Sequence, residues 1–317
     1  MIEIEHPKLL INDIEPYYET PLGAAYLGNS LDLLKKIPSE SIDLILTSPP
    51  FALTRQKPYG QSTDWIKTED YINWFMPFIY EFKRILKYDG SIVLHIGSSW
   101  KRGKPIKDPY NYRLFLKIID EVGLFLAQDF YWYNPAKLPS PAEWVTRRKI
   151  RVKDAVDPVW WFVKNDEGTT KANNLRVLKP YSISMKRLLK KKRYNSGPRP
   201  SGHVISKTGF LKDNNGAIPP NFISVAGTES NTPYLHGCKK LNIPINPARF
   251  PLNLPIFFIE FLTNEGDIIL DPFAGSNTTG EAAEMTNRRW ISIEIYEPYL
   301  LGSQFRFKKL ITSKPIT

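Results

Sequence analysis

The spacing of apolar residues along the chain predicts helices and strands in alternation. Apolar positions recur at helical spacing over residues 31–37, 69–86 and 112–122, and short apolar runs typical of strands occupy 42–46, 91–96, 125–132 and 160–163. Ser30 is the expected cap of the first helix, and Pro38 ends it. This alternation is typical of a parallel, doubly wound α/β sheet.

The pattern changes after Lys164 and resumes at Pro251. Residues 165–240 are rich in Asn, Ser, Gly, Pro and Lys and contain one short helical stretch, about 182–192, which indicates an inserted region that faces a groove. Downstream, the pattern predicts a helix at 255–263, a strand at 268–270, a helix at 278–285 and a strand at 290–293. A strand, a glycine turn, a helix and a further strand form a mononucleotide-binding βαβ unit.

Positive charge is concentrated in the inserted region. The formal net charge is +11, and the segment from Lys171 to Lys212 holds twelve Lys and Arg with no Asp or Glu. The rest of the chain is therefore close to neutral. A near-neutral body with one basic segment is typical of a protein that binds a polyanion, and a generic basic surface is the alternative.

The remaining composition narrows the class of protein. With 42% hydrophobic residues in 317, the chain can bury a sizeable core, and no apolar run is long enough to predict a membrane span. The first residues lack the basic start and apolar core of a signal peptide, and Cys238 is the single cysteine, so we expect a reducing cytoplasm and no internal disulfide. No spacing of His and Cys indicates a metal site.

The segment DPFAGSNTTG, residues 271–280, lies where a predicted strand passes into a helix. Gly275 permits close approach of the backbone, and the helix N-terminus offers free N–H groups. A P-loop would place Lys after Gly280, and a dinucleotide fingerprint would need glycine in place of Asn277, so both alternatives fail. A nucleoside with a zwitterionic tail fits better, with Glu294 at the end of the next strand accepting from ribose hydroxyls. The alternative is a tight turn and an unrelated surface glutamate.

The segment TSPPF, residues 47–51, follows a buried strand at the end where open α/β sheets place their sites. An exocyclic amine is a poor nucleophile because its lone pair is delocalised into the ring. The Ser48 hydroxyl and the Pro49 carbonyl can accept its two N–H bonds and localise that lone pair, while Phe51 can stack on the base. Proline restricts φ, so this geometry is preorganised. A purely structural turn is the alternative.

Together the two motifs resemble the amino-methyltransferases of restriction–modification systems, in the catalytic-first order of the circularly permuted β group. Serine before Pro-Pro is similar to the cytosine-N4 branch, whereas the adenine-N6 branch usually shows Asp-Pro-Pro-Tyr. Four further stretches resemble the PvuII-type cytosine-N4 methylases, namely KLPSP at 137–141, RKIRVKDAV at 148–156, RPSGH at 199–203 and PARFP at 247–251. The resemblance covers about residues 25 to 308.

The resemblance implies a Rossmann-like, doubly wound mixed sheet, S-adenosylmethionine as methyl donor and a base flipped out of double-stranded DNA. It makes 20–164 the catalytic half of the domain, 165–240 the target-recognition region and 241–311 the S-adenosylmethionine-binding half. The expected catalytic residues are Ser48, Pro49, Pro50 and Phe51. The expected cofactor-binding residues are Ser30, Phe250, Pro251, Asp271, Phe273, Gly275, Ser276, Thr278 and Glu294.

The expected activity is direct methyl transfer to N4 of cytosine at a specific site, which protects the DNA from a cognate restriction endonuclease. We expect a monomer or a weak dimer. Asn29 departs from the Gly-Asp-Ser often found in these enzymes, which leaves open any carboxylate role at that position. The alternatives are an adenine-N6 methylase, a guanine-N2 methylase of structured RNA and a non-catalytic DNA-binding module.

Three groups of residues are candidate DNA contacts. Lys190, Lys191, Lys192 and Arg193 form a run at a helix end that suits phosphate. Arg199, Ser201 and His203 lie on a predicted loop and can reach base edges in the major groove. Arg148 and Arg151 belong to a basic stretch that can line a cleft. A solvated charge run and a structural loop are the alternatives for the first two groups.

Overall fold

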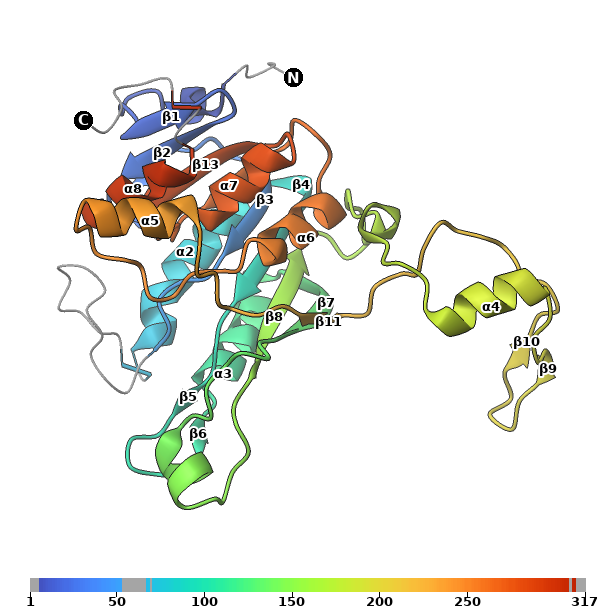
Figure 1. Cartoon of the computed structure of the whole chain (residues 1–317). Helices are drawn as coiled ribbons and strands as arrows, with labels where there is room; N and C mark the ends of the chain where they lie inside the picture. The colour runs from blue at the N-terminus through green and yellow to red at the C-terminus, as the bar shows by residue number, and fades with distance from the viewer. Residues whose placement is uncertain (1–5, 53–66, 69, 308–309, 312–317) are drawn as a thin grey trace. The chain divides into compact units, whose positions relative to one another are not determined.

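The computed structural model of the chain describes residues 6–52, 67–68, 70–307 and 310–311. It contains two compact units, which are coloured by residue number in Figure 1. The larger unit extends to Ala172 and resumes at Asn221, and the smaller unit comprises Asn173–Pro220.

The larger unit is built on a mixed sheet that has nine strands among the described residues, in the order β1-β2-β13-β12-β3-β4-β8-β7-β11. Their bounds in this order are Tyr18–Thr20, Gly23–Leu27, Arg289–Glu294, Ile268–Asp271, Ile42–Thr47, Leu86–His95, Val156–Val163, Phe125–Tyr133 and Phe222–Ser224. From β2 to β4 neighbouring strands are parallel, whereas β8 is antiparallel to both β4 and β7. A short hairpin of β5 (Ser99–Trp100) and β6 (Lys107–Asp108) lies outside this sheet.

The helices of the larger unit are α1 (Ser30–Leu34), α2 (Tyr71–Ile85), α3 (Tyr110–Lys117), α5 (Pro233–Lys240), α6 (Asn253–Leu262), α7 (Thr278–Met285) and α8 (Glu297–Ser303). A π-helical turn, Ile118–Val122, extends α3, and another occupies Glu143–Arg147. Short 3-10 segments occupy Pro7–Ile11 and Gln304–Arg306.

Alternate side chains of the sheet face two layers of helices. In β8, Trp160 and Phe162 contact Phe115 of α3, with ring centroids 5.1 and 5.8 Å apart, whereas Trp161 contacts Phe261 of α6 at 5.3 Å. Because successive side chains of a strand point to opposite faces, α3 and α6 cover opposite sides of the sheet. On the first side α2 packs against both α1 and α3. On the second side α7 packs against α6 (Figure 1). The predicted Rossmann-like, doubly wound mixed sheet is confirmed. The parallel sheet that the alternation alone indicated is wrong at β8, which runs antiparallel to β4 and β7.

The expectation that Ser30 caps the first helix is wrong. Asn29 is the cap, because its backbone is extended and its Oδ1 accepts from the Leu31 N–H at 2.9 Å. Ser30 is instead the first residue of α1, and its hydroxyl donates to the carbonyl of Pro272 just beyond β12. The serine therefore links α1 to the turn after β12.

Two elements of residues 165–240 were not expected from the sequence and belong to the larger unit. Strand β11 pairs in parallel with β7 and is the last strand of the sheet on that side. Helix α5 buries Tyr234, Leu235 and Cys238 against Phe305. Its Thr232 cap and the proline at its first position are a start signal that the sequence does contain.

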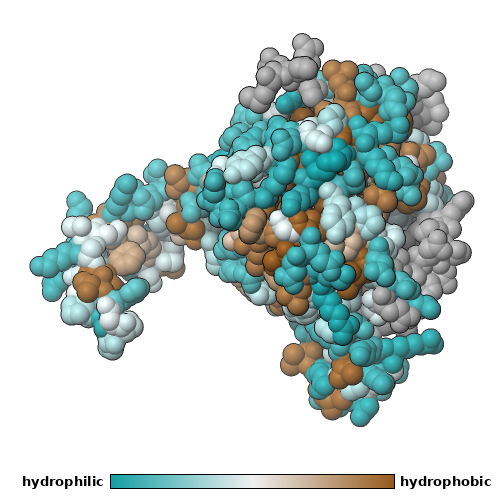
Figure 2. Space-filling model, turned by 180° about the vertical axis from the view of Figure 1, so that it is seen from behind, coloured by the Kyte–Doolittle hydropathy of each residue, from teal (hydrophilic) through white to brown (hydrophobic). Residues whose placement is uncertain are grey.

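The smaller unit has one α-helix among its residues, α4 (Ile183–Lys191), and a hairpin of β9 (Gly197–Pro198) and β10 (Val204–Ile205). A 3-10 turn, Asn174–Val177, lies near its start. Val177 is its only buried hydrophobic residue, so this unit has almost no apolar core. Hydrophilic residues also cover most of the molecular surface seen in Figure 2, where apolar residues show in separate groups.

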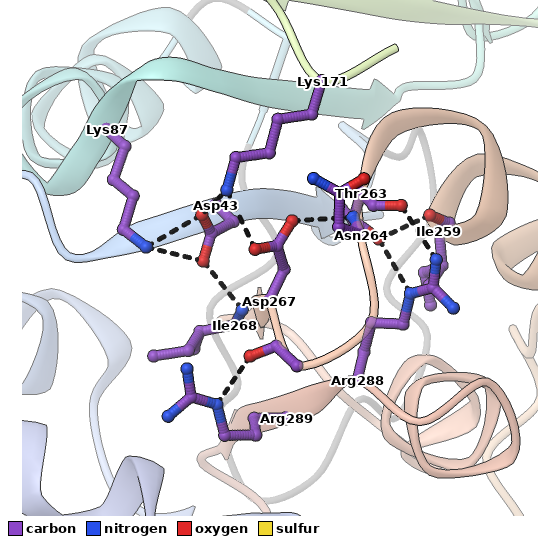
Figure 3. Close-up of polar contacts among 11 residues, drawn as sticks. Asp43, Lys87, Lys171, Ile259, Thr263, Asn264, Asp267, Ile268, Arg288 and Arg289 are labelled. Carbon is purple, nitrogen blue, oxygen red and sulfur yellow. Dashed lines mark hydrogen bonds and ion pairs between the residues drawn. The ribbon is translucent and has the colours of Figure 1, made fainter. Parts of the chain in front are cut away.

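A buried ion network lies at the amino-terminal ends of the central strands β3 and β12 (Figure 3). The carboxylate of Asp43 is inaccessible to solvent and accepts from Lys87 Nζ at 2.8 and 2.9 Å, from Lys171 Nζ at 2.5 Å and from the Ile268 N–H at 2.8 Å. Lys171 also contacts Asp267 Oδ1 at 2.9 Å. A buried carboxylate is tolerated only with such partners, so the network ties the starts of these two strands together.

Candidate active site

Strands β3 and β12 bring the two sequence motifs together. The strands are parallel neighbours in the sheet, and each motif follows the carboxyl end of its strand. The contact is direct, because the Thr47 hydroxyl donates to Asp271 Oδ1 at 2.7 Å. The motifs therefore meet at the carboxyl ends of the strands, where open α/β sheets bind their ligands.

A cavity of about 400 Å³ lies beside these strand ends in the larger unit. Its lining includes all four expected catalytic residues, Ser48, Pro49, Pro50 and Phe51, and eight of the nine expected cofactor-binding residues, Ser30, Phe250, Asp271, Phe273, Gly275, Ser276, Thr278 and Glu294. Pro251 differs, since it is buried beside Phe250 and does not belong to the described lining. The lining also includes Asn29, whose role the sequence left open, and members of the quoted segments 247–251 and 271–280 without an assigned role, Ala248, Arg249, Pro272, Ala274 and Thr279. Lining residues that the sequence did not point to are Trp74, Phe78, Asn246, Ile295, Tyr296 and Tyr299.

The catalytic side of the cavity is rigidly built. Pro49 is buried, while Ser48 and Phe51 are half-buried and face the cavity. The ring of Phe51 rests against Gly97 so closely that a Cβ at Gly97 would lie 2.5 Å from the ring. Glycine at position 97 therefore leaves the space that Phe51 occupies.

A histidine that the sequence did not point to contacts the serine. His95 ends β4, the strand next to β3, and its Nδ1 lies 2.9 Å from Ser48 Oγ. Burial lowers the pKa of His95 to about 4, so the imidazole is neutral at physiological pH. The signal that could have found it is its position at the end of the strand that follows β3 in the sequence.

The cofactor side of the cavity is built on a glycine in the left-handed region. Gly275 has φ +54°, and a Cβ there would lie 2.1 Å from Asn246 Nδ2. Its N–H donates to Glu294 Oε2 at 2.7 Å, and the Tyr296 N–H donates to Glu294 Oε1 at 2.8 Å. The turn after β12 and the end of β13 are thus joined through one carboxylate.

Two carboxyl groups on the cofactor side of the cavity have raised pKa values. Burial raises the pKa of Glu294 to about 7 and that of Asp271 to about 6. Asp271 accepts from the Thr47 and Thr279 hydroxyls and from the Phe273 N–H, at 2.7, 2.6 and 3.1 Å. Asp271 therefore organises the turn around the cavity as well as lining it.

Apolar side chains complete the wall at Phe273. The ring of Phe273 contacts both Trp74 and Phe78 of α2, with centroids 5.9 and 5.1 Å away. Ser276 and Thr278 follow it at the start of α7, and both are buried. The wall thus combines aromatic surface with hydroxyl groups.

The candidate DNA contacts of the larger unit are exposed. The guanidinium of Arg148 lies 5.1 Å from the centre of the Trp144 ring, in the loop between β7 and β8. Arg151 donates to the carbonyls of Ile150 and Pro105 at 2.7 and 2.9 Å, so its guanidinium supports that loop.

The other candidate DNA contacts all belong to the smaller unit. Lys190 and Lys191 occupy the last turn of α4, and Lys192 and Arg193 follow it, all exposed to solvent. Arg199, Ser201 and His203 lie in the tip of the β9–β10 hairpin, where the Arg199 N–H donates to the His203 carbonyl at 2.8 Å. Ser201 and His203 are exposed, and Arg199 is half-buried.

Cys238 is buried in α5, away from the cavity lining, and burial raises the pKa of its thiol. The described residues contain no group of three or more His, Cys, Asp or Glu that could hold a metal ion. In the same described ranges, none of the helices has the length and apolar character needed to span a bilayer.

Comparison with known proteins gives a consistent result. A family model described as DNA methylase matches residues 42–304. The type II methyltransferase M.PvuII of Proteus hauseri is 50% identical over 295 residues, which cover 92% of this chain and 86% of that protein. The type II methyltransferase M.BamHI of Bacillus amyloliquefaciens is 28% identical over 90% of this chain and 57% of its own length.

A solved structure described as PvuII DNA methyltransferase (cytosine-N4-specific) superimposes with a TM-score of 0.74 and 42% identity, over 96% of this chain and 91% of that one. The resemblance expected from the two motifs is therefore confirmed over nearly the whole chain. On the family match, the identity to M.PvuII and the shared fold, this chain belongs to the DNA methylase family of N6- and N4-amino methyltransferases.

Proposed function

We propose that this protein transfers a methyl group from S-adenosylmethionine to N4 of a cytosine at a specific site in double-stranded DNA. The observation that carries the proposal is that the Ser48 hydroxyl shares one cavity with Glu294 and the Gly275 turn. The cavity thus combines an acceptor for an exocyclic amine with a binding place for a nucleoside donor. Its volume falls within the range of small-molecule sites.

The residues of the cofactor side fit S-adenosylmethionine. Glu294, at the end of β13, has a carboxylate that can accept from ribose hydroxyls, as acidic residues at this place in α/β folds do. The turn at Gly275 requires glycine, because its φ is positive and Asn246 Nδ2 would lie 2.1 Å from a Cβ at this position. Phe273 offers apolar surface to the adenine. When bound, S-adenosylmethionine supplies an electrophilic methyl group on a sulfonium.

The residues of the catalytic side act on the nucleophile. The Ser48 hydroxyl and the Pro49 carbonyl accept the two N–H bonds of the target amine, which keeps its lone pair from spreading into the ring. Phe51 stacks on the flipped base. Because Pro49 and Pro50 restrict the backbone and Gly97 supports Phe51, little conformational entropy is lost when the base enters. Transfer is direct, and no cysteine of the described lining offers a covalent nucleophile.

The choice of cytosine rests on two observations. Serine precedes the two prolines, as in the cytosine-N4 branch of the family. The solved structure described as cytosine-N4-specific is 42% identical to this chain over nearly all of both. An adenine-N6 activity is the alternative that the product analysis below distinguishes.

We assign 20–164 to the catalytic half, 165–240 to target recognition and 241–311 to the S-adenosylmethionine-binding half. The compact unit Asn173–Pro220 falls within the assigned target-recognition region and carries the basic run after α4. Phosphate contact is proposed for that run, and contact with DNA in a cleft for Arg148 and Arg151. Base reading is proposed for the hairpin tip with Arg199, Ser201 and His203.

A cognate restriction endonuclease is proposed as the functional partner, since the activity protects a defined DNA sequence. We also propose that the enzyme works as a monomer or a weak dimer in the cytoplasm.

Product nucleoside analysis tests the function. Plasmid DNA is incubated with the purified protein and isotopically labelled S-adenosylmethionine, digested to nucleosides and separated against standards. We expect the label in N4-methylcytosine. Label in N6-methyladenine or 5-methylcytosine would overturn the choice of target, and no incorporation with a folded protein would overturn the enzymatic function.

A further inference from the structure

His95 lies behind the serine rather than in the cavity. Its Nδ1 is 2.9 Å from Ser48 Oγ, its side chain is 5% exposed, and it does not belong to the described residues that line the cavity. Any effect of His95 on a bound base must therefore pass through Ser48.

We propose that His95 is a positioning residue that holds the Ser48 hydroxyl with its lone pairs toward the target amine. In this arrangement the serine O–H donates to Nδ1 of His95. The oxygen of Ser48 is then free to accept an N–H of the amine, and the serine hydrogen points away from that amine. This inference rests on the amino-methyltransferase function proposed above.

The surroundings of the imidazole determine which of its nitrogens carries the proton. The rings of Phe51, Trp132 and Phe250 enclose it, with centroids 5.2, 5.3 and 5.5 Å from its own. Nε2 is buried and has no hydrogen-bond partner among the described residues. Within such a cage an N–H is attracted to an aromatic face, whereas a nitrogen lone pair is repelled by it. We therefore assign the proton to Nε2, which makes Nδ1 the acceptor.

The charge state of the ring also favours a hydrogen bond from the Ser48 O–H to Nδ1. Burial lowers the pKa of His95 to about 4. The charged groups that act on it are Asp157, which raises its pKa, and Lys137, which lowers it, and these two pair with each other at 2.9 Å. A neutral ring can accept at Nδ1, whereas a protonated ring would donate there. The serine hydrogen would then be free to turn toward the amine and oppose its N–H.

Without His95, the serine hydroxyl would rotate among its staggered positions, and only some of them present a lone pair to the base. Removal of His95 should therefore lower the rate of methyl transfer and leave binding of the methyl donor unchanged. In a Ser48→Ala background, which has no hydroxyl to position, removal of His95 should have no further effect on the rate.

A double-mutant cycle tests this dependence. The variants are His95→Leu, His95→Asn, Ser48→Ala and the double variant Ser48→Ala/His95→Leu, assayed on plasmid DNA that the wild type methylates. We expect His95→Leu to lower kcat on the order of 10-fold, as for one lost hydrogen bond, with S-adenosylmethionine affinity unchanged. His95→Asn, whose amide oxygen can replace Nδ1, should stay within about threefold of the wild type. The double variant should be no slower than Ser48→Ala alone.

Tyr110→Phe is the matched control, because the Tyr110 hydroxyl donates to the Gly97 carbonyl at 2.6 Å and is also buried. Any loss from this variant should multiply with that of Ser48→Ala. Multiplied losses in the Ser48→Ala/His95→Leu variant, or His95→Asn as slow as His95→Leu, would overturn the positioning role. If His95→Leu does not fold, the same cycle with His95→Gln, whose amide does not reach the Nδ1 position, decides. A wild type without methylated product would instead overturn the proposed function.

Discussion

Replacing Glu294 by Gln removes one negative charge from the cofactor side of the cavity. The two carboxylate oxygens already accept the N–H groups of Gly275 and Tyr296 at 2.7 and 2.8 Å, so the side chain is held in place before any ligand arrives. A glutamine has the same shape, but its amide would direct N–H bonds at one of these donors. It would also accept more weakly from the ribose hydroxyls.

Two magnitudes follow. A hydrogen bond to a charged group contributes about 1.5–3 kcal/mol, so S-adenosylmethionine should bind Glu294→Gln at least about 10-fold more weakly at pH 8.5. Burial raises the pKa of Glu294 to about 7, and the ionised form is the better acceptor. Wild-type affinity should therefore fall about fourfold between pH 8.5 and pH 6.5, as the ionised fraction falls. This pH dependence should be absent in Glu294→Gln.

Calorimetric titration with S-adenosylmethionine over this pH range measures both quantities. Glu281→Gln is the matched control, because Glu281 is also largely buried with a raised pKa but pairs with Arg306 outside the described lining. It should keep both the affinity and its pH dependence. Unchanged affinity in Glu294→Gln, with the wild-type pH dependence, would refute the assignment of Glu294 to the ribose.

Ser48→Ala should lower kcat on the order of 10²–10³-fold with little change in S-adenosylmethionine affinity, because the hydroxyl acts mainly in the transition state; near-full turnover would contradict its role. Asp43→Ala should lower the free energy of unfolding in urea by about 3–5 kcal/mol, since it breaks the buried network with Lys87 and Lys171. Its affinity for S-adenosylmethionine should not change, and a loss below about 1 kcal/mol would show that the network matters little. Cys238→Ser should keep its methylation rate, because direct transfer to N4 needs no thiolate. Abolished activity in a folded variant would favour methylation at C5 of cytosine, which needs a cysteine nucleophile. Lys190→Ala should weaken cognate and scrambled duplexes equally and reduce the slope of log K against log salt by about one unit. Arg199→Ala should cost about 1–3 kcal/mol on the cognate duplex only, and the reverse pattern in these two variants would exchange their roles.

Elements dominated by local patterns could be predicted from the sequence. The apolar runs 42–46 and 268–270 became β3 and β12, each one residue longer than the run. Helix α7 has the bounds that the helical spacing predicted. Short-range periodicity suffices in these cases because each element buries one continuous apolar face.

Elements that depend on distant partners were missed. Helix α5 is short, and its buried residues face Phe305, which lies far along the chain. The three residues of β11 form a strand only because the edge of β7 is available to pair with them. Neither partner can be read from local spacing.

The sequence by itself determined the chemistry of the two motifs: an acceptor hydroxyl before two prolines, and a glycine turn followed by an acidic strand end. Only the tertiary structure decided that these motifs share one cavity, because long-range pairing of β3 with β12 brings Thr47 into contact with Asp271. It also decided the state of His95. Nothing in the local sequence makes this histidine neutral, whereas three aromatic rings from separate segments exclude water from it and leave Nδ1 facing Ser48.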